Sequence, residues 1–301
     1  MSEKEKYGES KHTLLEVERI APLVTRYVIS APHIAKQRKA GQFVIVRTHK
    51  DSERIPLTIA DADEEKGTIT LIAQEVGKST ARMADMKVGD ELNDVAGPLG
   101  NPTHIENFGT VVVIGGGIGI APSHPIAQAL KKAGNRVVSI LGARTKELLI
   151  MEKEMRAASD MTIVCTDDGS YGKKGLVTQI LEEYINEYGK PDMVVGIGPL
   201  IMMDFVCRTT KKWGLPTVVS LNPIMVDGTG MCGGCRVTVG GKVKFVCVDG
   251  PEFDGHGVNF KELASRQSFY KQFEKLAYDD YLKRHPDHKC KLDEELAKIA
   301  K

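Results

Sequence analysis

The chain has 301 residues, of which 42% are hydrophobic and 27% are charged, and this is enough for a buried core and predicts two or three domains. The formal net charge of +1 argues against a nucleic-acid partner, a membrane-binding surface and acidic substrates. Because no uninterrupted apolar run has membrane-spanning length and the first residues lack a signal-peptide core, we expect a cytoplasmic protein without a membrane partner.

Residues 13–94 predict a sheet of short antiparallel strands. Segments such as "GQFVIVRTH" and "GTITLIAQEV" are rich in apolar and β-branched residues and are separated by Gly, Pro and Asp. This spacing is typical of a β-barrel. A turn-rich bridge, "VAGPLGNPTHIENFG", follows at residues 95–109. We therefore expect a first domain at residues 1–105.

One motif in the barrel segment suits a phosphate-bearing ligand. The stretch "ERIPLTIAD" contains Arg54, Pro56, Leu57 and Thr58. An arginine guanidinium forms paired hydrogen bonds with a pyrophosphate, and the Thr58 hydroxyl could bind the edge of a flavin. Taken alone, Arg54 is also consistent with a surface salt bridge.

A second motif follows about twenty residues later, in "EVGKSTARMADM". It places Gly77, Lys78, Ser79 and Thr80 at the start of a predicted helix, where backbone N–H groups could donate to a phosphate oxygen. A plain helix cap is the alternative. The motif is not a P-loop, because the upstream glycine and the buried strand leading into it are missing.

After residue 109, strands alternate with helices, and this predicts a parallel α/β sheet in a domain at residues 106–222. The stretch "VVVIGGGIGIAP" runs from a buried strand into a turn with the glycines Gly115, Gly116, Gly117 and Gly119. Such a turn lets the backbone approach a pyrophosphate. Ile120 occupies the third glycine position of a strict G-x-G-x-x-G, and a tight turn without a ligand is the alternative.

Two further loops are expected at the same edge of this sheet. The second strand ends in "LGARTKE", where Arg144 precedes Glu147, and a basic residue at this point favours NADP over NAD. "GIGPLIMM" is another strand-to-helix crossing, with Gly198 and Pro199 in its loop. An ordinary Gly-Pro turn is the alternative for that loop.

Residues 223–260 hold a cysteine cluster with the spacing D-x4-C-x2-C-x11-C, formed by Asp227, Cys232, Cys235 and Cys247. Plant-type iron–sulfur loops use C-x4-C-x2-C and a distant fourth cysteine, with glycines that let the loop wrap the cluster. A zinc site and a "CGGC" dithiol are the alternatives. Cys165 and Cys207 fall in a predicted strand and helix, where we expect core thiols.

Residues 261–301 are charged and have helical periodicity, which places Phe269, Tyr270, Phe273 and Leu276 on one face. "HPDHKC" at residues 285–290 could form a metal site, but we expect it to belong to a mobile, solvated tail.

The order of these motifs resembles the ferredoxin–NADP reductase superfamily over nearly all of the chain up to Phe260. Within it, the chain is similar to the electron-transfer subunits of class 1B dihydroorotate dehydrogenase. It is more similar to the small subunits of NADH-dependent reduced ferredoxin:NADP oxidoreductases. The first subfamily has a cysteine where this chain has Asp227, and the second uses one aspartate with three cysteines.

The resemblance implies FAD bound by the R-x-P-L-T and G-K-S-T motifs, NAD(H) at the glycine turn, and a 2Fe–2S cluster on Asp227 and the three cysteines. It favours NAD against the indication from Arg144. Hydride would pass between NAD(H) and FAD, and single electrons would pass between FAD and the cluster.

The resemblance also implies a heterodimer with a larger flavin and iron–sulfur subunit that reacts with ferredoxin and NADP(H), in an electron-bifurcating complex. A dihydroorotate dehydrogenase electron-transfer subunit is the second hypothesis. A zinc-stabilised, non-enzymatic nucleotide-binding module is the third.

Overall fold

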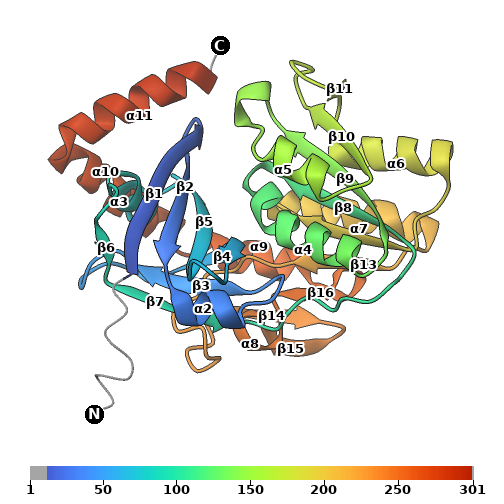
Figure 1. Cartoon of the computed structure of the whole chain (residues 1–301), viewed down its shortest axis with the longest axis horizontal. Helices are drawn as coiled ribbons and strands as arrows, with labels where there is room; N and C mark the ends of the chain where they lie inside the picture. Colours follow the sequence, from blue (N-terminus) through green and yellow to red (C-terminus); the bar gives the residue numbers. More distant parts are fainter. Residues whose placement is uncertain (1–11, 300–301) are drawn as a thin grey trace.

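The computed structural model describes residues 12–299 and begins with a barrel, drawn in blue and cyan in Figure 1. Seven antiparallel strands form it in the order β6–β1–β2–β5–β4–β3–β7. They are β1 (His12–Ala21), β2 (Val24–Ser30), β3 (Phe43–Arg47), β4 (Ile55–Asp63), β5 (Thr68–Gln74), β6 (Glu91–Leu92) and β7 (Asp94–Leu99). Two short helices, α2 (Pro32–Gln37) and α3 (Lys78–Ala84), complete it. Alternate residues such as Tyr27 and Ile29 fill its core.

Strand β7 corrects one expectation about the linker. We expected the bridge to begin at Val95, but Val95 and Ala96 pair with Val46 and Ile45 of β3. Val95 also packs into the barrel core, so this segment buries apolar surface that a bridge would leave exposed. The connection to the next unit therefore starts after Leu99.

The α/β unit contains a seven-stranded sheet in the order β11–β10–β9–β8–β12–β13–β16. Its strands are β8 (Thr110–Gly116), β9 (Arg136–Ala143), β10 (Met161–Thr166), β11 (Lys173–Lys174), β12 (Met193–Ile197), β13 (Thr217–Ser220) and β16 (Glu252–Asp254). Its helices are η1 (Gly117–Gly119), α4 (Ile120–Lys132), η2 (Lys146–Leu148), α5 (Glu152–Ala157), α6 (Val177–Tyr188) and α7 (Leu200–Trp213). All strand pairs are parallel except β13 with β16.

The continuous apolar run in β8 is explained by helices on both faces of this sheet. Val111 and Val113 pack in a core cluster with residues of α4 and α5. Val112 and Ile114 pack in another cluster with residues of α6 and α7. Because neighbouring side chains of a strand point to opposite faces and both faces are covered, all four residues from Val111 to Ile114 need apolar side chains.

The cysteine-bearing segment packs against both of the other units. It contains the hairpin β14 (Arg236–Val239) and β15 (Lys242–Phe245), the short helix α8 (Val246–Asp249) and η3 (Gly255–Gly257). Its strand β16 pairs with β13 of the α/β sheet. Its core also includes Phe43 of the barrel and Cys207 of α7. The segment is therefore held by contacts with both neighbours.

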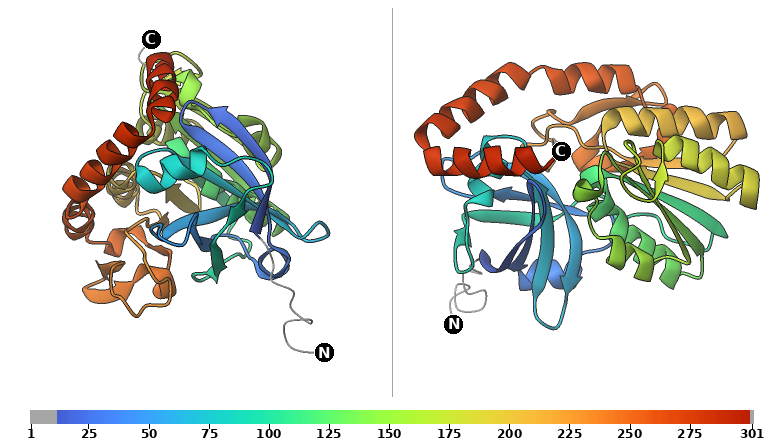
Figure 2. Two further views of the ribbon diagram at one scale, coloured as in Figure 1. Left: turned by 90° about the vertical axis from the view of Figure 1, so that its left-hand side faces the viewer. Right: turned by 90° about the horizontal axis from the view of Figure 1, so that it is seen from above.

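The C-terminal segment forms α9 (Phe260–Ser268), α10 (Lys271–Arg284) and α11 (Pro286–Ile299), so the predicted helicity is confirmed. The expectation of a solvated segment is wrong for Tyr281, His288 and Leu292, whereas Phe269, Tyr270, Phe273 and Leu276 of the predicted face are exposed. Helix α10 contacts α3, and α11 turns back along the barrel (Figure 2). Tyr281, His288 and Leu292 are buried there. Polar contacts hold part of this packing, and such contacts produce no apolar periodicity in the sequence. Among the described residues, no helix has the length and apolar character needed to cross a membrane.

Candidate functional site

The two barrel motifs expected to bind phosphate lie side by side. Helix α3 begins at Lys78, as predicted. The Ser79 hydroxyl donates to Oε2 of Glu53 at 2.7 Å, and Glu53 directly precedes Arg54. Arg82 of the same helix donates from Nη1 to the Ser52 hydroxyl at 3.2 Å. These bonds bring Arg54 and the turn at residues 77–80 to one surface of the barrel.

The turn at residues 77–80 is shaped by Thr80. Its Oγ1 accepts hydrogen bonds from the N–H groups of Val76 at 3.0 Å and Gly77 at 3.1 Å. It also donates to the Gly77 carbonyl oxygen at 3.0 Å. Space around Gly77 is open, because a Cβ placed there would meet nothing within 4 Å. The Thr80 side chain thus holds the turn itself, and the open backbone is the part left for a ligand.

The remaining residues of the first motif lie on β4. Pro56, Leu57 and Thr58 are half-buried and pair with Ile45, Val44 and Phe43 of β3. Leu57 packs against the barrel core. Thr58 is therefore positioned by a regular strand rather than by a loop.

Arg54 connects the barrel to the cysteine loop. Its Nε donates to the Val226 carbonyl oxygen at 2.7 Å, across 172 positions of the sequence. Val226 directly precedes Asp227. The expected flavin-binding arginine therefore touches the expected cluster loop, and this juxtaposition could not be read from either motif.

The glycine turn after β8 combines close packing with an open backbone. A Cβ at Gly119 would lie 2.3 Å from the Ile197 carbonyl oxygen and 2.7 Å from the Gly198 Cα. A Cβ at Gly115 would lie 2.9 Å from the Ile120 Cα. Gly117 has a φ of 55° and nothing within 4 Å of such a Cβ. Gly115 and Gly119 thus permit the strand-to-helix packing, whereas Gly117 faces free space.

A cavity of about 560 Å³ opens beside this turn, at the carboxyl edge of the sheet. Four of the expected residues line it: Gly116, Gly117, Arg144 and Pro199. Gly198 does not, but it packs against Met202, which does. The barrel contributes Val24 and Gln74, so the cavity lies between the two units.

Arg144 shares this cavity with an acidic residue that the sequence analysis did not single out. Asp167 follows β10, and its N–H donates to the Ala143 carbonyl oxygen at 3.0 Å. Burial raises the pKa of Asp167, while the nearby Arg144 opposes that rise. The cavity thus offers both a cation and a carboxyl group where the sequence rule considered only Arg144.

The three cysteines lie in one loop system. Cys235 and Cys247 are buried, with their sulfur atoms 3.3 Å apart, and Cys232 is exposed. The Cys247 N–H donates to the Cys235 sulfur at 3.4 Å, and the Gly234 N–H donates to the Cys232 sulfur at 3.5 Å. Burial, the Cys235 thiol and the Asp227 charge raise the pKa of Cys247 to about 12. Bound iron would have to displace that proton.

Asp227 organises the first part of this loop. Its Oδ1 accepts from the Thr229 N–H at 3.0 Å, and its Oδ2 accepts from the Cys232 N–H at 2.7 Å. The Thr229 bond, with a smaller contribution from Cys232, lowers the pKa of Asp227 to about 2. The carboxylate therefore remains ionised near neutral pH, as a metal ligand must be.

The donor set fits an iron–sulfur cluster by its chemistry. In the described part of the chain, no three His, Cys, Asp or Glu side chains already form a metal-binding group. However, the touching thiols of Cys235 and Cys247 join the loop at residues 227–235 to helix α8, and that loop also carries the Cys232 thiol and the ionised Asp227 carboxylate. Gly228, Gly230 and Gly233 have φ values of 76°, 82° and 66°, which allow this loop to fold tightly. Backbone N–H groups already point at two of the sulfurs, as cluster loops require.

The other two core thiols, those of Cys165 and Cys207, are unreactive. Cys165 and Cys207 are buried in β10 and α7, which confirms the expectation. Burial raises the pKa of each to about 12. Neither supports reactive or redox chemistry.

Sequence reasoning missed much of the lining of the cavity. Apolar residues of η2, α6, α7 and the loops beside them form most of it: Leu148, Ile150, Leu176, Val177, Ile201, Met202 and Phe205. None of these carries a local motif. Asp167 had one available signal, because "TDDG" directly follows a buried strand at the carboxyl edge of the sheet.

Two family models match parts of this chain. The iron-sulfur cluster binding domain of dihydroorotate dehydrogenase B matches residues 222–259. The oxidoreductase NAD-binding domain matches residues 113–208. These ranges contain the cysteine loop and most of the cavity lining described above.

Full-length relatives agree with these matches. A dihydroorotate dehydrogenase B (NAD⁺) electron transfer subunit homolog of Thermotoga maritima is 48% identical over 92% of this chain and 97% of its own length. The corresponding electron transfer subunit of Bacillus caldolyticus is 34% identical over 82% of this chain and 96% of its own length.

A solved structure is similarly close. One chain of the NADH-dependent reduced ferredoxin-NADP oxidoreductase, a structure described as giving insights into flavin-based electron bifurcation, is 46% identical to this protein. It superposes with a TM-score of 0.86 over 91% of this chain and 99% of its own. The expected ferredoxin reductase-like fold is confirmed. The chain belongs to the family of dihydroorotate dehydrogenase B electron-transfer subunits and their homologues, which are oxidoreductase subunits of the ferredoxin reductase type.

Proposed function

We propose that this protein moves hydride between NAD(H) and FAD, and single electrons between FAD and a 2Fe–2S cluster. The acceptor is a larger subunit of an NADH-dependent reduced ferredoxin:NADP oxidoreductase. The observation that carries the proposal is the continuity of three sites. The nucleotide cavity meets the barrel at Gln74, and Arg54 of the barrel meets the cysteine loop at Val226. Three redox sites along one path are what such an electron-transfer subunit needs.

At the nucleotide site, the chain supplies shape and charge. The backbone at Gly116 and Gly117 would be the approach for the pyrophosphate, and Pro199 would help to hold the nucleotide from the other loop that lines the cavity. Arg144 and Asp167 face the ribose end and together set the preference between NAD and NADP. A carboxylate there repels a 2′-phosphate, which supports NAD(H) as the substrate.

At the flavin site, Arg54 pairs with the pyrophosphate of FAD, and Pro56, Leu57 and Thr58 border its ring. The open backbone at Gly77, Lys78 and Ser79 receives a second part of the phosphate, with Thr80 holding the turn. Among the residues that the structure describes, Lys78 has no hydrogen-bond or ion-pair partner, so its charge is available to phosphate. When bound, FAD accepts two electrons together and releases them singly, which a 2Fe–2S cluster requires.

At the cysteine loop, Cys232, Cys235 and Cys247 supply three thiolates and Asp227 supplies an oxygen ligand. The exposed Cys232 places one edge of the loop at the surface, where electrons can leave toward a partner. We therefore assign the exit of the electron path to this edge.

The partner in this proposal is a larger flavin and iron–sulfur subunit that reacts with ferredoxin and NADP(H), in an electron-bifurcating heterodimer. Its support is the 46% identical chain of the bifurcating oxidoreductase. No nucleic acid or membrane partner is part of the proposal, and the cytoplasm is the proposed compartment. In this proposal, FAD is bound by residues 1–105, NAD(H) by residues 106–222 and the cluster by residues 223–260, and a helical appendage follows at residues 261–301.

A second candidate function is electron transfer to a dihydroorotate-oxidising subunit. The family match over residues 222–259 and the names of the sequence relatives favour it. Asp227 argues for the first proposal, because a dihydroorotate dehydrogenase loop places a cysteine at this position.

Three measurements test these assignments. Anaerobically purified protein should show flavin and iron–sulfur absorption, with iron and acid-labile sulfide; a colourless, zinc-containing protein would support the nucleotide-binding module instead. The native complex should contain a ferredoxin- and NADP(H)-reactive subunit, and a dihydroorotate-binding partner would reverse the choice between the two enzymes. Asp227→Cys should keep the cluster but change its spectrum and potential. An unchanged spectrum and potential would remove Asp227 from the ligand set.

A further inference from the structure

The C-terminal helices lie across the part of the barrel that carries the flavin turn. Helix α10 packs against α3, and α11 continues along the barrel as far as η2 of the α/β unit (Figures 1 and 2). Glu295 of α11 accepts a hydrogen bond through Oε2 from the Leu23 N–H at 3.2 Å. Leu23 is followed by Val24, which lines the nucleotide cavity. The hairpin of α10 and α11 thus runs from the flavin turn to the edge of the nucleotide site.

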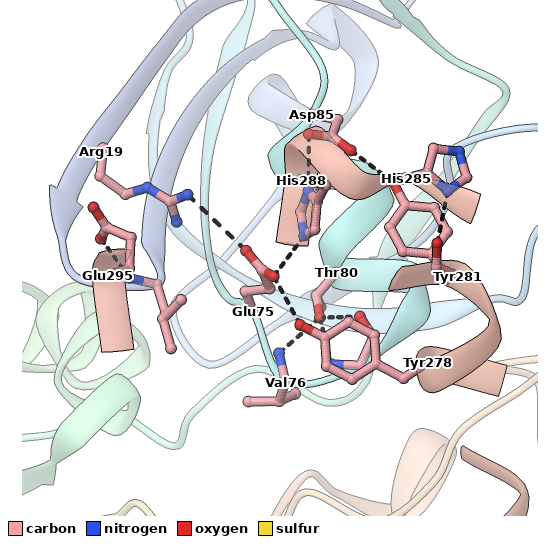
Figure 3. Close-up of polar contacts among 12 residues, drawn as sticks. Arg19, Glu75, Val76, Thr80, Asp85, Tyr278, Tyr281, His285, His288 and Glu295 are labelled. Atoms are coloured by element: carbon pink, nitrogen blue, oxygen red, sulfur yellow. Dashed lines mark hydrogen bonds and ion pairs between the residues drawn. The ribbon is translucent and has the colours of Figure 1, made fainter. Parts of the chain in front are cut away.

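His288 is the main polar anchor of this hairpin, and Figure 3 shows it between two carboxyl groups. Its Nε2 lies 2.8 Å from Oε1 of Glu75, and its Nδ1 lies 2.9 Å from Oδ1 of Asp85. Only 6% of the His288 side chain and 3% of the Glu75 side chain are exposed. A buried ring with both nitrogens on carboxyl oxygens is held in one orientation.

The two carboxyl groups stand at the two ends of the flavin turn and its helix. Glu75 is two residues before Gly77, and Asp85 is the C-terminal cap of α3. Helix α10 adds two phenols, since Tyr278 donates to Glu75 at 2.9 Å and Tyr281 donates to Asp85 at 2.6 Å. His288 and these tyrosines therefore bracket residues 76–84 from outside the barrel.

The two hydrogen bonds of His288 to Glu75 and Asp85 depend on the protonation of its ring. A neutral imidazole carries one N–H, so it can donate to only one of the two carboxylates, whereas an imidazolium donates to both. Burial alone lowers the pKa of His288, but the bonds to Asp85 and Glu75 outweigh burial and leave it raised. His288 therefore donates to both Glu75 and Asp85 below the ordinary histidine pKa of about 6.5. One of these two hydrogen bonds is lost as the pH rises through the raised pKa of His288.

Other charged and titratable groups face the same cluster. They are Arg19, with Nη2 4.0 Å from Glu75 Oε2, Arg82, 6.0 Å from the centre of the Tyr281 ring, and His285, which stacks on Tyr281 at 4.1 Å. Burial raises the pKa of both Tyr278 and Tyr281, so these phenols remain donors at any pH of interest. His288 is thus the group with a raised histidine pKa that lies between the two carboxylates.

We infer that α10 and α11 form a clasp that holds the FAD-binding turn at residues 77–80 in place, with His288 as its positioning residue. This inference rests on the proposed flavin site. It adds that FAD retention depends on a segment about 200 residues away in the sequence, which is hydrogen-bonded to Glu75 and Asp85 on the two sides of the turn. It also makes FAD release faster as pH rises.

The test compares His288→Gln with His104→Gln in the full-length, cluster-loaded protein. His104 is a matched control because its side chain is 78% exposed and its ion pair is with the exposed Glu106, on a different part of the surface from the flavin turn. We expect FAD to dissociate about 10-fold faster from His288→Gln than from the control, since one charge-assisted hydrogen bond of a buried cluster is lost. Amide hydrogen exchange at residues 77–84 and 271–290 should speed up together in His288→Gln alone.

The pH profile separates positioning from general stabilisation. In the unmodified protein, FAD release should accelerate as the pH rises above about 6.5, and in His288→Gln it should be fast and nearly independent of pH. The profile of the unmodified protein decides the matter even if the variant fails to fold. A flat profile there, or equal release from His288→Gln and the control, would overturn the clasp.

Failure of the flavin assignment itself looks different. In that case Arg54→Ala would leave FAD bound as tightly as before, or the purified protein would contain no FAD at all. If Arg54→Ala releases FAD while His288→Gln changes only hydrogen exchange and not FAD release, the flavin site stands and the clasp is merely structural.

Discussion

Replacing Gly119 by alanine tests the packing of the nucleotide-binding turn most directly. The added Cβ would lie 2.3 Å from the Ile197 carbonyl oxygen and 2.7 Å from the Gly198 Cα, and both are backbone atoms that no side-chain rotation can move. An ordinary contact is about 3.4 Å or more, so the two strand-to-helix loops must separate by about 1 Å. Overpacking of this kind costs roughly 1–3 kcal/mol, and we expect the upper half of that range.

Two other glycines provide matched controls. Gly117→Ala meets no atom within 4 Å but has a φ of 55°, so only the left-handed backbone penalty of about 1–2 kcal/mol applies. Gly77→Ala meets nothing and has an extended φ of −172°, so its stability should change by less than about 0.5 kcal/mol. The predicted order of stability is therefore Gly77→Ala, then Gly117→Ala, then Gly119→Ala.

Thermal unfolding and NADH-dependent flavin reduction read out this series. At roughly 2–4 °C per kcal/mol, Gly119→Ala should lower the unfolding midpoint by about 4 °C or more. It should also slow flavin reduction, because the displaced loops line the nucleotide cavity. Gly117→Ala should be the more stable of the two and still lose nucleotide affinity, since its methyl group would occupy the space for a ligand. A Gly119→Ala protein as stable as the Gly77→Ala control and as active as the unmodified protein would refute the packing argument.

Three further predictions concern the other sites. Arg54→Ala should lower FAD affinity by about 10-fold or more, and it should speed up hydrogen exchange in the loop around Cys232, because the 2.7 Å bond to Val226 is lost. Arg54→Lys should not restore both FAD affinity and slow exchange. Unchanged FAD binding would exclude Arg54 from the flavin site. Asp167→Asn should raise kcat/KM for NADPH relative to NADH, since it removes a negative charge beside Arg144, and an unchanged ratio would exclude Asp167 from nucleotide selection. Iodoacetamide at pH 8 should modify the exposed Cys290 and spare Cys165 and Cys207, because their raised pKa values of about 12 keep these two thiols protonated. Peptide mass spectrometry that shows early alkylation of Cys207 would contradict this prediction.

The turn positions and the element types were predictable because they depend on neighbours in the sequence. The apolar run of β8 and the glycines after it indicated a buried parallel strand ending in a turn, and the helix after Gly77 begins where its residues predicted. The order of the motifs was enough to indicate the superfamily, and the comparisons confirm that fold.

The junctions between the units could not be predicted, since each depends on residues far apart in the chain. Nothing near Arg54 points to Val226, and nothing near Glu252 shows that β16 completes the sheet of the α/β unit. Such pairings are decided by which surfaces meet once the units fold, and this leaves no periodicity in either segment.

The C-terminal helices show the same division between local and long-range information. Their helicity follows from periodicity, which the sequence alone determines. Their position does not, because His288 and Tyr281 are buried by hydrogen bonds to Glu75 and Asp85 of the barrel rather than by an apolar stripe. A histidine buried against two carboxylates and a histidine in a solvated tail have the same sequence signature. Only the tertiary structure, which brings the charges together away from water, distinguishes them.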